Sequence, residues 1–208
     1  MNCDRIARAY RWLEYLAFGH ELERRRLRFL PEIASARRAL LLGDGDGRFL
    51  ARFASASDAS VDYVELSAAM LELARTRAGT RAAFHPADAL TYPFAPHSHD
   101  LIVTHFFLDC FNASELNMLI ARVREAACPG ARWLISEFRQ PRWASPLLAA
   151  LYLFFRVTTG LRTNRLVDHR PILRRHGFRL VAEETSRAGL LASELWELPC
   201  GSTLRRTP

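Results

Sequence analysis

Residues 39–53, ALLLGDGDGRFLARF, place a loop with glycine at every second position directly after a short, continuous apolar run. Such a run is typical of a strand buried on both faces, and the apolar spacing of Phe49, Leu50 and Phe53 after the loop is typical of a helix. Glycine permits backbone angles and close approaches that a side chain would prevent. The segment therefore predicts the first strand, loop and helix of an open α/β sheet, with a ligand bound at the loop.

Strand-like and helix-like segments alternate along the rest of the chain. Ser67 and Ser114 stand where N-cap residues belong, and Pro129-Gly130 stands where the second of these helices should end. Strands that alternate with helices over one domain indicate a mostly parallel sheet covered by helices on both faces. The expected strands are residues 39–43, 61–66, 82–85, 100–106, 131–138, 177–184 and 194–198.

Length and composition narrow the class of protein. The 208 residues suit one full-sized domain, and the hydrophobic half of the composition excludes wholesale disorder. The net charge of +7 is carried by arginines spread along the chain, which favours a solvated surface over a nucleic-acid patch. Four cysteines without a C-x-x-C pair indicate neither a zinc ribbon nor a redox dithiol. The scattered cysteines also give no disulfide framework, which favours the reducing cytoplasm.

Two segments bear on membranes. The N-terminal residues have no uninterrupted apolar core of the kind found in a secretory signal. The longest apolar run, residues 146–155, is about half the length needed to span a bilayer. A helix over residues 145–157 is therefore compatible with a peripheral membrane contact or with a lid over an apolar pocket.

The aspartates of the glycine loop discriminate among ligands. The dinucleotide fingerprint G-x-G-x-x-G occurs in neither register, and the chain instead has G-x-G-x-G at Gly43, Gly45 and Gly47. Phosphate cradles use backbone amides, lysine and hydroxyl groups. Asp44 and Asp46 would repel a phosphate by roughly 1 kcal/mol or more at a few ångströms. The loop therefore favours a cationic ligand.

Five segments in this order resemble the motifs of the class I S-adenosylmethionine-dependent methyltransferases. The resemblance covers about residues 10–198 and implies a single-domain, Rossmann-like α/β fold with S-adenosylmethionine as cofactor. It also implies a mostly parallel seven-stranded sheet with helices on both faces and an antiparallel last strand. The segments are LLGDGDGRF (41–49), VELSAAMLELAR (64–75), FHPADALTYPF (84–94), HDLIVTHFFLDCF (99–111) and ACPGARWLISEF (127–138).

The resemblance also implies an internal organisation. One methyltransferase domain spans residues 1–208, with an N-terminal helical cap at 1–35, a cofactor-binding core at 36–140, and substrate-lid helices and final strands at 141–208. The N-terminal pattern looks most like the branch that contains ubiquinone/menaquinone-biosynthesis and phospholipid-type methyltransferases. The detailed substrate signatures of that branch do not occur in this chain, so the likeness bears on the fold and the cofactor more than on the acceptor.

The cofactor-binding residues are expected at the carboxyl ends of the first strands. Glu65 ends the second strand, where its carboxylate can accept hydrogen bonds from both ribose hydroxyls, and Asp88 follows the third strand, where it can accept from the adenine amino group. The family often has an acidic residue at the position of Leu41, so either Asp44 or Asp46 takes over part of its task or cofactor affinity is reduced. The expected cofactor-binding residues are Gly43, Asp44, Gly45, Asp46, Gly47, Glu65, Leu66, Met70, Asp88, Ala89 and Thr104.

The acceptor site is expected after the fourth and fifth strands. Methyl transfer to a protonated nucleophile needs a base, and His105 is the best-placed candidate, with Asp109 as the residue that orients it. The alternative role for His105 is a polar residue that lines the pocket. Aromatic residues near these strands favour a small, apolar acceptor, and no metal site is expected. The expected substrate-contacting residues are Tyr10, Tyr15, Phe106, Trp143 and Tyr152.

Other functions stay open at this point. Residues 104–107 lack the Asn/Asp-Pro-Pro-aromatic sequence typical of adenine and glutamine amino methylation, which disfavours nucleic acid as a partner. An RNA methyltransferase nevertheless fits the positive charge, and a non-catalytic S-adenosylmethionine-binding scaffold fits the departure at Leu41. A nicotinamide oxidoreductase is disfavoured by the missing fingerprint and by the charge of the loop. The sequence specifies no oligomeric state.

Overall fold

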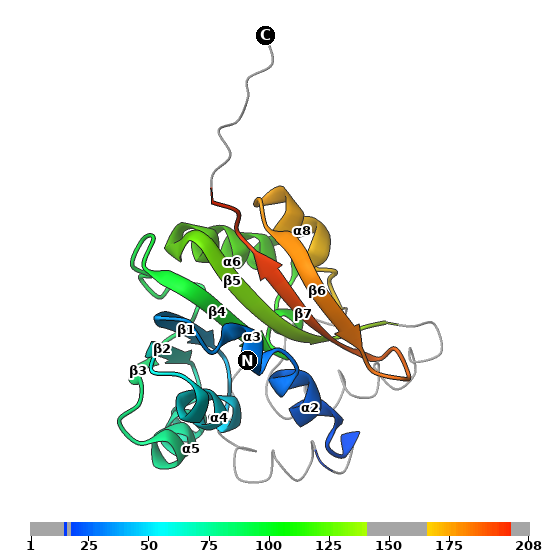
Figure 1. Cartoon of the computed structure of the whole chain (residues 1–208). Helices are drawn as coiled ribbons and strands as arrows, with labels where there is room; N and C mark the ends of the chain where they lie inside the picture. Colours follow the sequence, from blue (N-terminus) through cyan, green and yellow to red (C-terminus); the bar gives the residue numbers. More distant parts are fainter. Residues whose placement is uncertain (1–14, 16–17, 141–165, 201–208) are drawn as a thin grey trace.

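The computed structural model describes residues 15, 18–140 and 166–200, which form one seven-stranded sheet with helices on both faces (Figure 1). The strand order is β3-β2-β1-β4-β5-β7-β6. β7 runs antiparallel to both of its neighbours, and the other neighbouring pairs are parallel. The expected fold class, including the antiparallel last strand, is confirmed.

The seven expected strands are all present, with ends that differ by a few residues. The strands are β1 (Arg38–Leu42), β2 (Ser60–Glu65), β3 (Ala83–Pro86), β4 (His99–His105), β5 (Ala127–Phe138), β6 (Arg179–Thr185) and β7 (Leu191–Glu197). The described helices are α2 (Glu21–Leu27), α3 (Leu30–Ile33), α4 (Arg48–Ala56), α5 (Ala68–Ala78), the 3₁₀ helix η1 (Leu108–Cys110), α6 (Ala113–Ala126) and α8 (Arg170–Arg175).

Two apolar clusters, one on each face of the sheet, hold these elements together. In β1, Leu40 and Leu42 pack toward α6 and α8, whereas Ala39 and Leu41 pack toward α3, α4 and α5. The alternation follows from the two-residue period of a strand. Because both faces of β1 are buried, its sequence is a continuous apolar run rather than an alternating one.

The register of the central strands brings three residues to one edge of the sheet. Leu42, at the end of β1, pairs with Val64 of β2 on one side and with Thr104 of β4 on the other. The next residues along these strands, Gly43, Glu65 and His105, therefore lie side by side at the carboxyl edge. This is the edge at which ligands bind in open α/β sheets.

β5 begins earlier than expected. The strand predicted at residues 131–138 extends back to Ala127, so Pro129-Gly130 lies inside the strand instead of between helix and sheet. Gly130 takes a φ of +82°, and Ala127 pairs with His99 across a register shift in β4. The next pair is Leu101 with Arg132, so the extra residues lie in β5, and a bulge in that strand accommodates the turn-like dipeptide within the ladder.

The predicted N-cap of α6 was wrong by two residues. Asn112, not Ser114, is the cap: its side-chain oxygen accepts the N–H groups of Ser114 (2.9 Å) and Glu115 (3.0 Å). The Glu115 carboxylate accepts the Asn112 N–H in return, at 3.0 Å. The pair forms a capping box, which satisfies helix N–H groups that have no partner within the helix.

Asn112→Ala should lower the free energy of unfolding by about 0.5–2 kcal/mol, because the substitution removes the acceptor of two helix N–H groups. Urea denaturation monitored by circular dichroism measures this change. Ser114→Ala is the matched control, since Ser114 is exposed and caps nothing. An equal loss of stability in both variants would contradict the assignment of the cap.

Several expectations fall outside the described residues: Tyr10, Trp143, Tyr152 and the apolar helix expected at 145–157. Among the residues that the structure describes, no helix is both long enough and apolar enough to cross a membrane.

Candidate functional site

The three glycines of the loop after β1 all take left-handed backbone angles, with φ of +62°, +68° and +75°, but they face different surroundings. A Cβ on Gly43 would lie 2.1 Å from the ring of Phe107, and a Cβ on Gly47 would lie 2.7 Å from the Cβ of Ala74 in α5. A Cβ on Gly45 would meet no atom within 4 Å. Gly45 is therefore the glycine of this loop that faces open space.

Hydrogen bonds from β2 fix Gly45. The Tyr63 hydroxyl donates to the Gly45 carbonyl at 2.8 Å, and the Gly45 N–H donates to Glu65 Oε2 at 3.3 Å. Glu65 Oε1 accepts the Ser67 N–H at 2.8 Å, at the start of α5. Burial raises the pKa of Glu65, while these N–H groups act in the opposite direction. The carboxylate thus ties the loop to the next helix and keeps lone pairs for further donors.

Asp88 lies on the same edge of the sheet as Glu65. Glu65 pairs with Pro86 of β3, and the Ala87 N–H donates to the Glu65 carbonyl at 3.1 Å. Asp88 is exposed, and its Oδ1 accepts the Leu90 N–H at 2.9 Å in the turn that follows. Two carboxylates therefore lie beside the open face of the loop.

The other residues expected around the cofactor divide by exposure. Leu66 is 43% exposed beside Glu65, whereas Met70 and Ala89 are buried in the core. Thr104 is fully buried, and its hydroxyl accepts the indole N–H of Trp133 at 3.0 Å. The side chains of Met70, Ala89 and Thr104 thus support the edge from within rather than present polar atoms at it.

The two aspartates of the loop have different surroundings in the structure. Asp46 binds Arg48 through Oδ1 (2.9 Å) and Arg77 through Oδ2 (2.8 Å), so its charge is balanced by two arginines. Their charges hold the pKa of Asp46 below its usual value despite its burial. The sequence pattern predicts the same role for both aspartates, but Asp44 has no such ion pair with α4 or α5.

Asp44 is buried, and only one of its two carboxylate oxygens accepts a hydrogen bond. Its Oδ2 accepts the Leu50 N–H in the first turn of α4 at 3.2 Å, while its Oδ1 has no hydrogen-bond partner. Burial raises the pKa of Asp44 to about 7, against the opposing charge of Arg26. A buried, unpaired carboxylate oxygen is costly, so it marks a place where a donor from a ligand would fit.

His105 and Asp109 do not form the expected hydrogen bond. Both ring nitrogens of His105 are buried without a partner, and the ring packs edge-on against Phe49 of α4, with 4.6 Å between the centroids. Asp109 lies on the other side of the sheet, where its Oδ1 accepts the Cys110 thiol at 3.5 Å. The spacing of four residues does not bring them together because the chain turns after His105 into η1. The assignment of Asp109 as the orienter of His105 was wrong.

Burial and the charge of Arg26 also lower the pKa of His105 well below its usual value. The imidazole is therefore neutral near pH 7 and able in principle to accept a proton. Its burial, at 3% exposure, means that such a proton would have to come from a group inside this part of the site.

Aromatic side chains from three segments meet at the carboxyl edge. The ring of Phe138, at the end of β5, lies 5.2 Å from the ring of Phe106 and 5.4 Å from that of Phe18, between centroids. The Arg26 guanidinium lies over Phe106 at 5.1 Å. Tyr15 is half-exposed and packs edge-on against His20, at 5.0 Å. Phe18, Phe106 and Phe138 are hereafter the edge aromatic cluster.

Glu137 is a functional candidate that the sequence analysis missed. It is 1% exposed near the end of β5, and its Oε1 accepts the N–H groups of Phe107 (2.9 Å) and Leu108 (2.7 Å). Its Oε2 is buried without a partner. Burial and the nearby Asp109 carboxylate raise the pKa of Glu137 well above its usual value, and burial raises that of Asp109 to about 6. Its one available signal was a carboxylate within the apolar run WLISEF.

Glu137→Gln should reduce the loss of stability that the protein shows when the pH is raised from about 5 to about 8. Unfolded Glu137 loses its proton near its ordinary pKa of about 4.3, whereas the folded protein keeps it to higher pH. The folded state then binds more protons over this window, so its stability falls as the pH rises. Glutamine keeps the acceptor for both N–H groups and does not titrate.

Urea denaturation at the two pH values measures this difference. Glu72→Gln, a change at an exposed glutamate of α5, is the matched control and should leave the pH dependence as it is in the wild type. A wild-type pH dependence in Glu137→Gln would show that Glu137 is ionised across the whole window.

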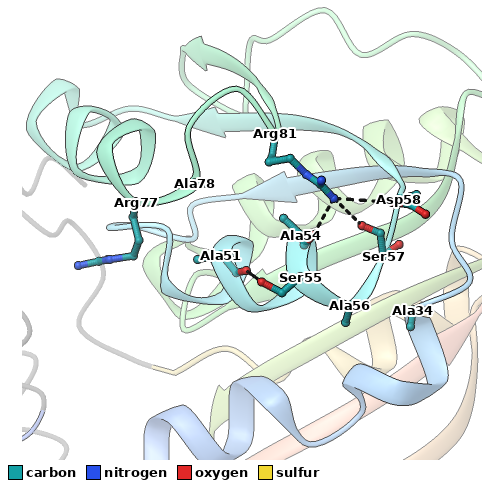
Figure 2. Close-up of a pocket in the computed structure, with 10 residues that line it drawn as sticks. All are labelled: Ala34, Ala51, Ala54, Ser55, Ala56, Ser57, Asp58, Arg77, Ala78 and Arg81. Carbon is teal, nitrogen blue, oxygen red and sulfur yellow. Dashed lines mark hydrogen bonds and ion pairs between the residues drawn. The ribbon is translucent and has the colours of Figure 1, made fainter.

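A hollow lies away from this edge. It has a volume of about 740 Å³ and lies between α4, α5 and the end of α3, where alanine and serine side chains line most of it (Figure 2). Arg81 closes one side, donating to the carbonyls of Ala54 (2.6 Å) and Ser57 (3.1 Å). Arg77, which also lines the hollow, binds Asp46 of the glycine loop. No lining side chain has a buried polar atom without a partner, so this hollow offers no comparable site.

Comparison with known proteins relates this site to a protein family. Residues 39–130 match the family model described as a methyltransferase domain, which spans the glycine loop, Glu65, Asp88 and the turn after β4. The chain carries an S-adenosylmethionine-dependent methyltransferase domain. S-adenosylmethionine is accordingly its cofactor. No curated protein sequence gives a significant match.

Solved structures share the fold of this methyltransferase at low sequence identity. An S-adenosylmethionine-dependent methyltransferase from Mesorhizobium loti is 20% identical over 87% of this chain and 97% of its own, with a TM-score of 0.66. One from Methanosarcina mazei is 21% identical over 81% and 94%, with a TM-score of 0.61. The N-methyltransferase NodS from Bradyrhizobium japonicum, in complex with S-adenosyl-L-homocysteine, is 15% identical over 86% and 88%, with a TM-score of 0.65.

The residues present fit this cofactor. The unpaired Asp44 oxygen suits an ammonium group, the remaining lone pairs of Glu65 suit vicinal hydroxyls, and the open face of Gly45 admits close approach. No group of three or more metal-ligating side chains occurs in the described part of the chain.

Proposed function

We propose that this methyltransferase transfers the methyl group to a small, apolar acceptor. The observation that carries the proposal is the edge aromatic cluster, whose three half-buried rings lie where β4 and β5 end. Aromatic surface of this kind binds an apolar ligand by burying its surface and by ring stacking.

The cofactor contacts proposed for this chain come from Gly43 and from four further groups. The Gly45 backbone provides the close approach, Glu65 accepts the ribose hydroxyls, and Asp88 accepts the adenine amino group. Asp44 takes the role that the family gives to an acid at position 41, because its Oδ1 is unpaired and Leu41 is fully buried in the core. Asp46 holds the loop to its arginines instead. When bound, the cofactor supplies the activated methyl group.

The chain's own residues must then align the acceptor, exclude water and, for a protonated nucleophile, take up a proton. His105 is suited to take it as a neutral imidazole without hydrogen-bond partners. Asp109 is suited as a half-buried carboxyl whose pKa of about 6 lies near neutrality. We propose these two residues as alternative bases that act independently.

The related structures do not select the acceptor atom. They include an N-methyltransferase, an O-methyltransferase family protein from Burkholderia thailandensis and the [4+2]-cyclase SpnF. The chemistry at this edge therefore varies within one fold, and the acceptor class follows from the residues at the edge. We place the activity in the cytoplasm, in keeping with the free Cys110, Cys128 and Cys200. The lid or membrane contact expected from residues 145–157 belongs to the same proposal.

Labelled methyl transfer from S-adenosylmethionine to a cell extract, separated into lipid, small-molecule, RNA and protein fractions, tests the proposal. Label is expected in the small-molecule or lipid fraction. Label in RNA or protein would contradict the acceptor class, and no transfer to any fraction would favour a non-catalytic binding protein.

Glu65→Ala should slow this transfer by roughly 5- to 150-fold at low cofactor concentration, corresponding to the loss of roughly 1–3 kcal/mol of charge-assisted hydrogen bonds. Asp58→Asn, a change at a fully exposed carboxylate after α4, is the matched control and should transfer at the wild-type rate. Equal rates in Glu65→Ala and the control would show that Glu65 does not bind the cofactor.

A further inference from the structure

The ring of Phe107 fills the space that the missing side chain of Gly43 leaves. Three ring carbons lie 2.1, 2.5 and 2.9 Å from the position of a Cβ on Gly43. These separations are far inside van der Waals contact, so the ring itself covers the Gly43 backbone. On this side, Gly43 is shielded from any ligand, in contrast to Gly45, where a Cβ would meet nothing within 4 Å.

The turn that holds Phe107 in this place is strained and clamped. Phe106 takes a φ of +53°, in the left-handed region that side chains disfavour. Its N–H donates to the Ser136 carbonyl at 2.7 Å, and the next two N–H groups donate to the buried Glu137 carboxylate. Strain of this kind persists only where the surroundings hold it, and here β5 supplies the acceptors of all three N–H groups.

The ring is braced on its other side as well. Phe107 packs edge-on against Phe111, with 5.0 Å between the centroids and 82° between the planes. Phe107 is nevertheless only half-buried, whereas Phe111 is part of the core. Movement of the ring away from Gly43 would therefore cost its contact with Phe111 and part of its packing against the core cluster, but no strand pairing.

We propose that Phe107 is an aromatic gate over Gly43, whose ring must move before the cofactor reaches the first glycine of the loop. The proposal rests on cofactor binding at this loop and concerns how tightly the chain binds it. The contacts of the ring with Gly43 and Phe111 stabilise the covered arrangement. Cofactor affinity is then lowered by the fraction of molecules in which Gly43 is uncovered. Glu137 is a positioning residue for the gate, because it fixes the backbone of the turn.

Removal of the ring should therefore increase the affinity of the chain for S-adenosylhomocysteine. Phe107→Ala should bind S-adenosylhomocysteine more tightly than the wild type, by about 3- to 10-fold in Kd, because no ring has to be displaced. Titration calorimetry on the full chain measures this change. An ordinary wall residue of the pocket would give the opposite result, since its loss removes contacts from the ligand.

Phe94→Ala is the matched control. Phe94 is also half-buried, packs against the same core cluster as Phe107 and lies under the Arg122 guanidinium, 5.4 Å from the ring centroid. It should lose comparable stability without a change in Kd. An unchanged or weaker affinity in Phe107→Ala, while the wild type binds, would overturn the gate alone. If neither the wild type nor Phe107→Ala binds S-adenosylhomocysteine, both the gate and the cofactor contacts proposed above are wrong.

A second measurement keeps the ring in place, so that it does not depend on the folding of the alanine variant. With para-fluorophenylalanine at position 107, the ¹⁹F resonance should shift when S-adenosylhomocysteine is added, because the ring leaves Gly43. The same label at position 94 should keep its chemical shift. A bound complex in which the resonance at position 107 stays unchanged would overturn the proposal.

Discussion

The site depends on the sharp turn between β1 and α4, which three left-handed glycines at alternate positions make possible. Gly43 allows the Phe107 ring to lie against the backbone, Gly47 allows α5 to approach through Ala74, and Gly45 leaves an open face. The positive φ at each of them also excludes most side chains on conformational grounds. One loop therefore sets the distances between β1, α5 and the turn after β4.

Buried carboxylates hold this arrangement in place, each in a different way. Glu65 bridges the loop and the start of α5, Asp46 joins it to arginines of α4 and α5, and Glu137 clamps the turn after β4. Asp44 accepts one bond from α4 and keeps one oxygen unpaired. Because a buried carboxylate is stable only with partners, these bonds fix backbone positions. Asp44 and Glu137 each keep one buried oxygen without a partner, and of the two only Asp44 belongs to the glycine loop.

The fold was accessible from the sequence because its signals are local. Continuous apolar runs marked the strands buried on both faces, and turn residues marked their ends. The errors arose where local rules compete. Asn112 and Ser114 are both good N-caps, and only the reciprocal bond from Glu115 selects the first. Pro129-Gly130 is a turn dipeptide that the ladder of β5 accommodates as an irregularity.

Only part of the site could be predicted from the sequence. Glu65 and Asp88 were predictable because the carboxyl ends of parallel strands meet at one edge, whatever the details of packing. Asp44 and Asp46 could not be told apart, since their roles depend on arginines brought in by α4 and α5. Glu137 was missed because its partners lie in a turn about thirty residues earlier in the chain. Side-chain direction after β4 likewise separates His105 from Asp109.

The central claim is that this loop receives a cationic, adenosine-containing cofactor rather than a dinucleotide. Titration calorimetry of the unmodified chain with S-adenosylmethionine and, separately, with NADH tests it most directly. The account predicts saturable binding of S-adenosylmethionine at one site per chain and no measurable binding of NADH. Binding of NADH without binding of S-adenosylmethionine would contradict it.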